Sequence, residues 1–205
     1  MSGSEERFAR LLAQPIMARI CSALDSHSPV AAAEEEGVRK AAVALIFRLG
    51  ENDVLELLFI KRAEYEGDPW SGQIAFPGGR AEERDASLAQ TAVRETREET
   101  GIDLAHEGMI VGRLDDLRPQ AVRLPAIMVR PFVALLDRSE PLVLSGEVAL
   151  SFWLPFAELT RGDSWEEGTV RAGGVQINAR VFKHDEHVIW GMTERILAQL
   201  LALLR

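Results

Sequence analysis

The stretch that decides the fold reads Gly-Gln-Ile-Ala-Phe-Pro-Gly-Gly-Arg at residues 72–80 and Leu-Ala-Gln-Thr-Ala-Val-Arg-Glu-Thr-Arg-Glu-Glu-Thr-Gly-Ile at residues 88–102. Its first part alternates like a half-buried strand until Pro77 and the two glycines after it break the pattern. Its second part predicts a helix capped by Asp85 or Ser87 and ended by its own glycine. The stretch therefore predicts a strand, a glycine loop and a helix.

Three carboxylates gather near the end of this helix, at Glu95, Glu98 and Glu99. At about 100° per residue, Glu95 and Glu99 continue the stripe that Leu88 and Ala92 begin, and Glu98 lies beside it. Acids this close together repel one another and are costly to desolvate beside apolar rows, so we expect a cation among them. Hard divalent cations such as Mg²⁺ or Mn²⁺ prefer oxygen ligands of this kind.

The glycine loop supplies the other half of this candidate site. Gly78 and Gly79 permit a turn tight enough to aim a backbone carbonyl or amide at the same cation or at a phosphate. The alternative is that residues 94–99 form a solvated, charged helix face, which is the usual role of a charge run taken alone.

Length and composition restrict the class of protein. The chain has 205 residues and is 47% hydrophobic, enough for one domain with an ordinary core. A net charge of −9 argues against a nucleic-acid or anionic-membrane partner held by a basic surface. The lone Cys21 excludes an internal disulfide framework and fits a reducing compartment. Because we also recognise no cleavable signal and no membrane-length apolar run, we expect a cytoplasmic protein.

The N-terminal region differs from the rest of the chain. Residues 4–24 carry apolar side chains at nearly helical spacing and predict one or two amphipathic helices broken near Pro15. Residues 26–37 contain an alanine run and three glutamates and are typical of a linker or a solvated surface helix. We therefore expect an N-terminal helical extension and linker over residues 1–37 and one domain over residues 38–205.

Strand patterns recur along this domain, at residues 41–47, 54–61, 108–114, 127–136 and 148–154. We expect the first two to form a hairpin, residues 170–188 to form another, and residues 189–204 to form a closing amphipathic helix. Several strands with one helix in mid-chain and one at the end predict an α+β fold, as an α/β/α sandwich around a mixed β-sheet.

Taken together, Phe-Pro-Gly-Gly and the later Arg-Glu-x-x-Glu-Glu-x-Gly-Ile resemble the Nudix box, G-x5-E-x7-R-E-U-x-E-E-x-G-U, in which U is aliphatic. The chain departs from this box in three places: Arg80 stands where the glycine belongs, Asp85 is the nearest substitute for the first glutamate, and Thr96 replaces an aliphatic residue. These departures affect the loop and leave the three helix carboxylates in place. The resemblance implies the Nudix fold and a metal-dependent hydrolase.

Other segments are similar to the coenzyme A pyrophosphohydrolase branch of that family. They are Leu-Leu-Phe-Ile-Lys-Arg-Ala at residues 57–63, Leu-Asp-Asp-Leu at 114–117 and Ile-Trp-Gly-Met-Thr at 189–193. The branch has a second arginine between Arg62 and Gly72, and this chain has none there. The resemblance implies hydrolysis of the diphosphate bridge of coenzyme A to 3′,5′-ADP and 4′-phosphopantetheine.

The resemblance also implies roles for particular residues. As metal ligands it implies Glu95, Glu98, Glu99 and the carbonyl of Gly79. As catalytic residues it implies Glu98, Glu99 and the orienting Arg94, with Glu147 as an alternative general base. Around the substrate it implies Arg62, Gly78 and Gly79. Further arginines are weaker candidates for phosphate contact, namely Arg118, Arg123 and Arg130.

Two alternatives stay open. Another Nudix specificity, for ADP-ribose or a nucleotide sugar, would use the same metal helix with a different pocket. A ligand-binding module without catalysis would need no metal carboxylates, so the three glutamates speak against it. In each case the partner is a small-molecule nucleotide, and apolar positions on the N-terminal helices leave a homodimer open. We expect His184-Asp185-Glu186-His187 to form a hairpin tip and not a metal cluster.

Overall fold

The computed structural model describes residues 3–119, 126–137, 141–161, 164–172 and 175–205. Its main sheet contains β1 (Arg39–Leu49), β2 (Leu55–Arg62), β3 (Ile74–Ala75), β4 (Gly78–Arg80), β5 (Gly108–Arg113), β6 (Ile127–Leu136) and β7 (Val148–Pro155). β1 and β6 pair in parallel, and the other pairs are antiparallel, so the predicted mixed sheet of an α+β fold is confirmed. The predicted hairpin of β1 and β2 is present, with a 3-10 turn at Glu51–Asp53.

A second, smaller sheet follows in the chain, with the order β10-β9-β8. It consists of β8 (Trp165–Ala172), β9 (Val175–His184) and β10 (His187–Ile189). The expected hairpin over residues 170–188 is thus part of a longer, three-stranded meander. His184 pairs with His187 across the turn between β9 and β10, as a hairpin tip requires.

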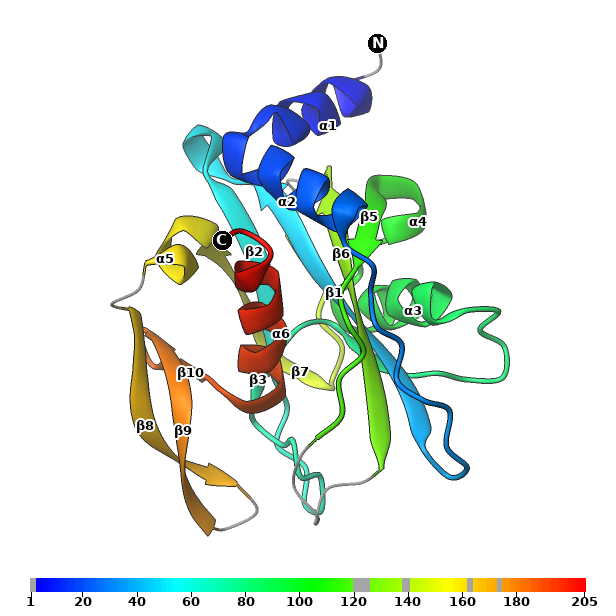
Figure 1. Ribbon diagram of the computed structural model, residues 1–205, viewed down its shortest axis with the longest axis vertical. Helices are drawn as coiled ribbons and strands as arrows, with labels where there is room; N and C mark the ends of the chain where they lie inside the picture. Colours follow the sequence, from blue (N-terminus) through cyan, green and yellow to red (C-terminus); the bar gives the residue numbers. More distant parts are fainter. Residues whose placement is uncertain (1–2, 120–125, 138–140, 162–163, 173–174) are drawn as a thin grey trace.

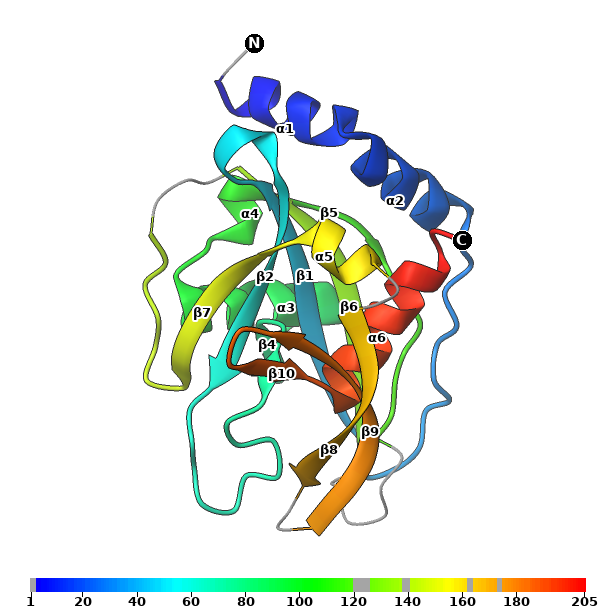
Figure 2. The same ribbon diagram turned by 90° about the vertical axis from the view of Figure 1, so that its left-hand side faces the viewer.

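Helices cover both faces of the main sheet (Figures 1 and 2). β1 alternates in the manner of a doubly covered strand: Ala44 and Ile46 point into the core under α3 (Leu88–Thr100) and α4 (Leu104–Glu107). Leu45 and Phe47 point into the opposite core, with α1 (Gly3–Ala13), α2 (Pro15–Ser26), α5 (Phe156–Thr160) and α6 (Gly191–Ala202). The result is the predicted three-layer sandwich.

The N-terminal segment forms two helices, broken at the predicted proline. Pro15 stands in the first turn of α2, where its missing N–H costs no hydrogen bond. Leu11, Met17 and Ile20 are buried in the main core, so these helices pack on the domain itself. No helix in the described residues is long and apolar enough to cross a membrane.

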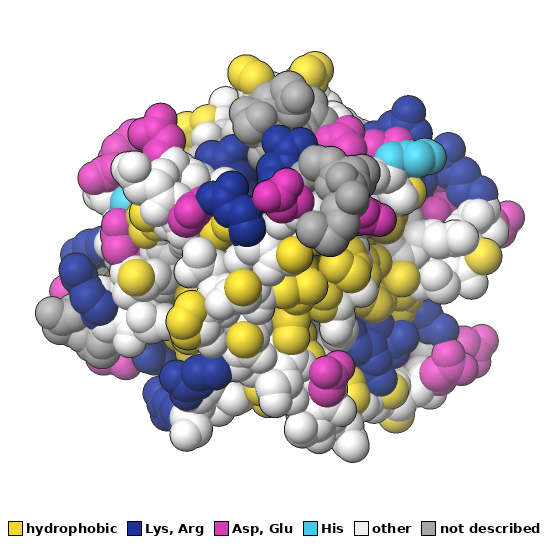
Figure 3. All heavy atoms as spheres, turned by 90° about the horizontal axis from the view of Figure 1, so that it is seen from above, with side chains coloured by type: hydrophobic (Ala, Val, Ile, Leu, Met, Phe, Trp, Pro, Cys, Tyr) yellow, Lys and Arg dark blue, Asp and Glu magenta, His cyan; other side chains and the backbone are white. Residues whose placement is uncertain are grey.

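The end of the molecule that carries α1 shows apolar side chains gathered among charged ones (Figure 3). Leu12 of α1 is among the exposed large apolar residues. Nothing seated on this surface identifies an occupant, and a homodimer formed through the N-terminal helices stays a prediction.

The glycine loop lies where β1 and β2 separate. In β1 only Phe47–Leu49 pair with β2. β4 fills the opening against β1, and β3 fills it against β2, so the segment predicted as a broken loop is itself part of the sheet. The strand expected before Pro77 is limited to Ile74–Ala75, and Pro77 has no N–H with which to continue a ladder.

Candidate active site

The helix that carries the glutamates begins and ends with local signals. Ser87 is the N-cap of α3, and its hydroxyl accepts a hydrogen bond from the Gln90 N–H. Gly101 ends the helix in the left-handed region at φ +72°, which only glycine enters without strain. Of the two predicted caps, the structure therefore uses Ser87, and Asp85 is left for another partner.

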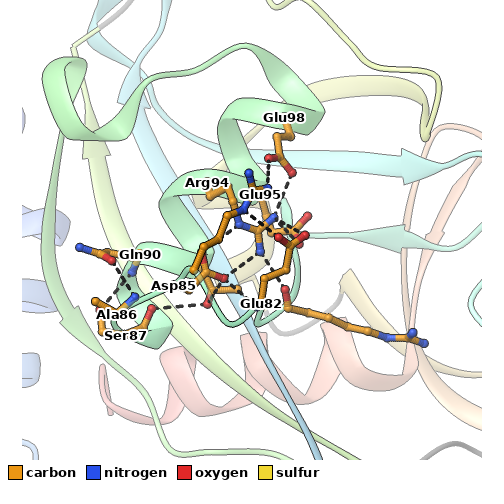
Figure 4. Close-up of polar contacts among 11 residues, drawn as sticks. Glu82, Asp85, Ala86, Ser87, Gln90, Arg94, Glu95 and Glu98 are labelled. Carbon is orange, nitrogen blue, oxygen red and sulfur yellow. Dashed lines mark hydrogen bonds and ion pairs between the residues drawn. The ribbon is translucent and has the colours of Figure 1, made fainter.

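That partner is Arg94, which forms the centre of a polar network (Figure 4). Its Nε and Nη2 donate to the two carboxylate oxygens of Asp85, each at 2.9 Å. Its Nη1 donates to Glu95 and to Glu98, also at 2.9 Å, and its Nη2 donates to the Arg80 carbonyl at 2.8 Å. Arg94 thus ties the glycine loop to the helix and orients two of the three glutamates.

The electrostatics of this network follow from burial and pairing. The guanidinium of Arg94 holds the pKa of Asp85 well below its usual range, and Asp85 in turn raises the pKa of Arg94. Asp85 therefore takes the structural place of an acidic anchor for the arginine, despite its shifted position in the sequence.

Glu99 lies deepest of the helix carboxylates. Glu99 is only 3% exposed to solvent. Its Oε2 accepts a hydrogen bond from the Gly78 N–H at 2.9 Å. Burial raises the pKa of Glu99 to about 7, against the opposing effects of that N–H and of Arg62. Burial likewise raises the pKa of Glu95, opposed by its bond to Arg94. Both carboxylates are thus poorly compensated when charged, which is the condition that a bound cation relieves.

The absence of a side chain at Gly79 leaves room for the carboxylate of Glu95. A Cβ at this position would lie 2.5 Å from Cδ of Glu95, well inside contact distance. The donors fit a hard divalent cation, since they are carboxylate oxygens beside a glycine backbone. In the arrangement described, Glu95 and Glu98 bond to Arg94, and no three acidic, histidine or cysteine side chains of the described residues are grouped as a ready ligand set.

A cleft of about 930 Å³ opens over this network. The eight residues to which the resemblance gives a role in metal binding, catalysis or substrate binding all line it, namely Arg62, Gly78, Gly79, Arg94, Glu95, Glu98, Glu99 and Glu147. The structure therefore brings together side chains from β2, the glycine loop, α3 and the loop before β7.

The loop that carries Glu147 is docked on the end of the helix. The Ser145 N–H donates to the Glu99 carbonyl at 3.0 Å, and the Ala63 N–H donates to the Glu147 carbonyl at 2.8 Å. The charge of Glu147 contributes to the raised pKa values of Glu95 and Glu99. A fourth carboxylate thus acts on the same site from the loop before β7.

The sequence did not nominate the residues that hold Arg62. Asp68 accepts a hydrogen bond from Nη2 of Arg62 at 3.0 Å, and its other oxygen accepts from the Trp70 N–H. The hydroxyl of Tyr65 donates to the Gly146 carbonyl and so joins this loop to the one that carries Glu147. The acid and the proline after it signal a turn in the sequence, but nothing there pairs that acid with the arginine.

Several other nominations lie away from the cleft. Arg118 and Arg130 line a separate cavity and pair with Glu35 and Asp116, so the structure does not bring these weaker candidates into the cleft. Arg123 lies outside the described residues.

Fold and site together define a carboxylate-bearing helix set against a glycine loop in a mixed sheet, the arrangement that a Nudix box implies. The family described as NUDIX domain matches residues 38–172, and the chain belongs to this family.

Particular relatives are similar over most of this region. An uncharacterized Nudix hydrolase NudL of Photorhabdus laumondii is 33% identical over 132 residues, covering 63% of this chain and 67% of that protein. The peroxisomal coenzyme A diphosphatase ndx-8 of Caenorhabditis elegans is 30% identical over 128 residues, covering 61% of this chain and 52% of that protein. A solved Ap4A hydrolase of Caenorhabditis elegans is 24% identical with a TM-score of 0.49, covering 59% of this chain and 82% of that one.

The aligned region thus spans about half to two thirds of the curated relatives named here. These matches confirm the resemblance to the Nudix family and the prediction of a Nudix hydrolase. The relative named for coenzyme A supports the resemblance to that branch. Divalent metal ions are the general cofactors of Nudix hydrolases, in agreement with the predicted metal class.

Proposed function

We propose that this protein hydrolyses the diphosphate bridge of coenzyme A or its derivatives to 3′,5′-ADP and 4′-phosphopantetheine, with Mg²⁺ or Mn²⁺ as cofactor. The observation that carries the proposal is the cleft, which joins the glutamates of α3 to an apolar wall. The similarity to a coenzyme A diphosphatase adds support.

The acidic end of the cleft suits a diphosphate only when a cation is present. Glu95, Glu98 and Glu99 would hold it, with the Gly79 carbonyl as a further donor. When bound, a divalent ion neutralises diphosphate oxygens and lowers the pKa of a coordinated water. Arg94 would keep the glutamates oriented, and Arg62, which lines the same cleft, would contact a phosphate oxygen.

A second carboxylate is needed to accept the proton of the attacking water, and two positions qualify. Glu147 lines the same cleft from the loop before β7, and Glu98 lies at the exposed rim of the cleft. We assign the role of general base to Glu147. Glu98 already accepts hydrogen bonds from both Arg84 and Arg94, so its lone pairs are less available to accept a proton from water.

The opposite wall of the cleft favours a substrate with a long uncharged arm. Ala41, Ile127 and Val129 form a small buried cluster there, and Trp70 and Met192 pack against it. Such a wall offers apolar contact to a pantetheine arm and little hydrogen bonding to the second ribose of ADP-ribose. This contrast favours coenzyme A over a nucleotide sugar.

The test is a hydrolysis panel with magnesium. Release of 3′,5′-ADP from coenzyme A and of AMP from ADP-ribose is measured for the wild type, for Glu99→Gln and for the exposed control Glu83→Gln. We expect coenzyme A to be the better substrate and Glu99→Gln to lose at least about a hundredfold in rate, as when one charge-stabilising group is removed. Faster ADP-ribose hydrolysis would favour the alternative specificity, and full activity under strong chelation would contradict the metal-dependent reaction.

The cellular location is part of the same proposal. We propose the cytoplasm, supported by the single cysteine and the acidic composition.

A further inference from the structure

The outer strand of the small sheet has a free edge. β8 pairs with β9 over all eight of its residues without a register shift, and its other edge has no strand beside it among the described residues. Figure 1 shows β8 at the margin of the molecule, on the side away from α3. An unpaired edge presents a row of N–H and C=O groups that another strand can join.

The charges on this strand are arranged symmetrically about one residue. Glu167 and Arg171 lie two positions before and two positions after Thr169, so the three side chains share a face of the strand. Both charged residues are exposed, and neither forms an ion pair within the part of the chain that the structure describes. A strand with this pattern is complementary in charge to an antiparallel copy of itself.

Backbone geometry limits how two such copies can pair. In an antiparallel ladder, two residues that face each other direct their N–H and C=O groups either both toward the partner strand or both away from it. These groups alternate in direction along a strand, so residues that face each other in a pair of identical strands are separated by an even number of positions. The two-fold axis therefore passes between one residue and the same residue of the second copy. An axis at Glu167 sets like charges opposite each other, and one at Gly168 sets Glu167 opposite a threonine. An axis at Thr169 sets each Glu167 opposite Arg171 of the second copy.

We propose that two copies of this chain join through β8 with the axis at Thr169, forming a continuous sheet of six strands. The opposite face of the same strands supports this register. Val170 then lies across from Gly168 of the second copy and diagonal to its Val170. In each chain Val170 pairs with Ile177, which is 40% exposed, so an apolar row of four side chains would cross the axis.

The proposal predicts a specific pattern of variant behaviour. Glu167→Arg sets arginine opposite arginine, and Arg171→Glu sets glutamate opposite glutamate, so each single variant should associate at least about tenfold more weakly than the wild type. An equimolar mixture of the two single variants restores both opposite-charge pairs in a heterodimer. The double variant restores them in a homodimer.

The full-length protein is measured by sedimentation velocity at about 1 to 100 µM, a range that covers moderate affinities. Glu51→Arg, on the exposed turn after β1, is the matched charge control and should associate like the wild type. Coenzyme A hydrolysis and thermal unfolding of each variant confirm that the monomer is intact. Dimerisation of the wild type with recovery in the mixture supports the interface. A wild type of 22.7 kDa throughout, or a dimer that both single variants leave unchanged, would overturn it.

Discussion

The substitution Gly79→Ala tests whether the position of the Glu95 carboxylate matters for catalysis, because it displaces this carboxylate without removing it. The Cβ that it adds would lie 2.5 Å from Cδ of Glu95 and 2.6 Å from each carboxylate oxygen. Ordinary contacts to a Cβ begin near 3.4 Å. The carboxylate must therefore retreat by about 1 Å, and it can do so because it stands at the free end of a flexible side chain.

The expected magnitude follows from this displacement. A shift of about 1 Å in a catalytic group costs on the order of a hundredfold in rate. The backbone of Gly79 is not in the left-handed region, so alanine adds no strain there, and we expect the free energy of unfolding to change by less than about 1 kcal/mol. Activity should thus fall steeply in a protein that remains stably folded.

The assay compares Gly79→Ala with Gly146→Ala, another glycine that lines the same cleft. A Cβ at Gly146 meets nothing within 4 Å, so the control should keep nearly the wild-type rate. Release of 3′,5′-ADP gives the rate, Mn²⁺ titration calorimetry gives the affinity for the ion, and thermal unfolding gives the stability. Wild-type rate and Mn²⁺ affinity in Gly79→Ala would refute the assignment of Glu95 to the metal.

Three further predictions concern the same network. Asp85→Asn leaves Arg94 without its bidentate partner and should lower the free energy of unfolding by about 2 to 3 kcal/mol, measured by urea denaturation. Arg62→Met should raise the KM for coenzyme A at least about tenfold with a smaller change in kcat, measured by initial rates, and an unchanged KM would remove Arg62 from the substrate site. In chelator, stability should fall by up to about 3 kcal/mol as pH rises from 5 to 8, because folded Glu99 keeps its proton up to a pKa of about 7 while the unfolded carboxyl loses it near 4.5. Urea denaturation at each pH should show a flatter profile for Glu99→Gln, and parallel profiles would contradict the burial of that charge.

The order of the helices and strands follows largely from local signals. Proline at position 15 marked the break between the first two helices, and Gly101 marked the end of α3. The spacing of the glutamates placed them on one helix face, because helical periodicity depends only on neighbouring residues. The Nudix resemblance extended these signals to a list of eight residues, and all eight line one cleft.

The pairing of distant residues depended on the tertiary structure. Asp85 bonds to Arg94 instead of capping the helix, because the loop that carries it folds back along α3. Asp68 holds Arg62 through a turn, and Glu147 reaches the helix glutamates from a loop that is close only in space. A sequence shows which groups carry charge, but it does not show which distant residues the loops bring into contact.

The sequence by itself determined the chemical character of the site: three carboxylates on one helix face, next to a glycine turn, in an acidic chain. Only the tertiary structure decided how that site is built. The early separation of β1 from β2 created the opening that the glycine strand fills, and burial there raised the pKa of Glu99. The physical reason is that side-chain spacing along a helix is a local property, whereas desolvation depends on everything packed around it.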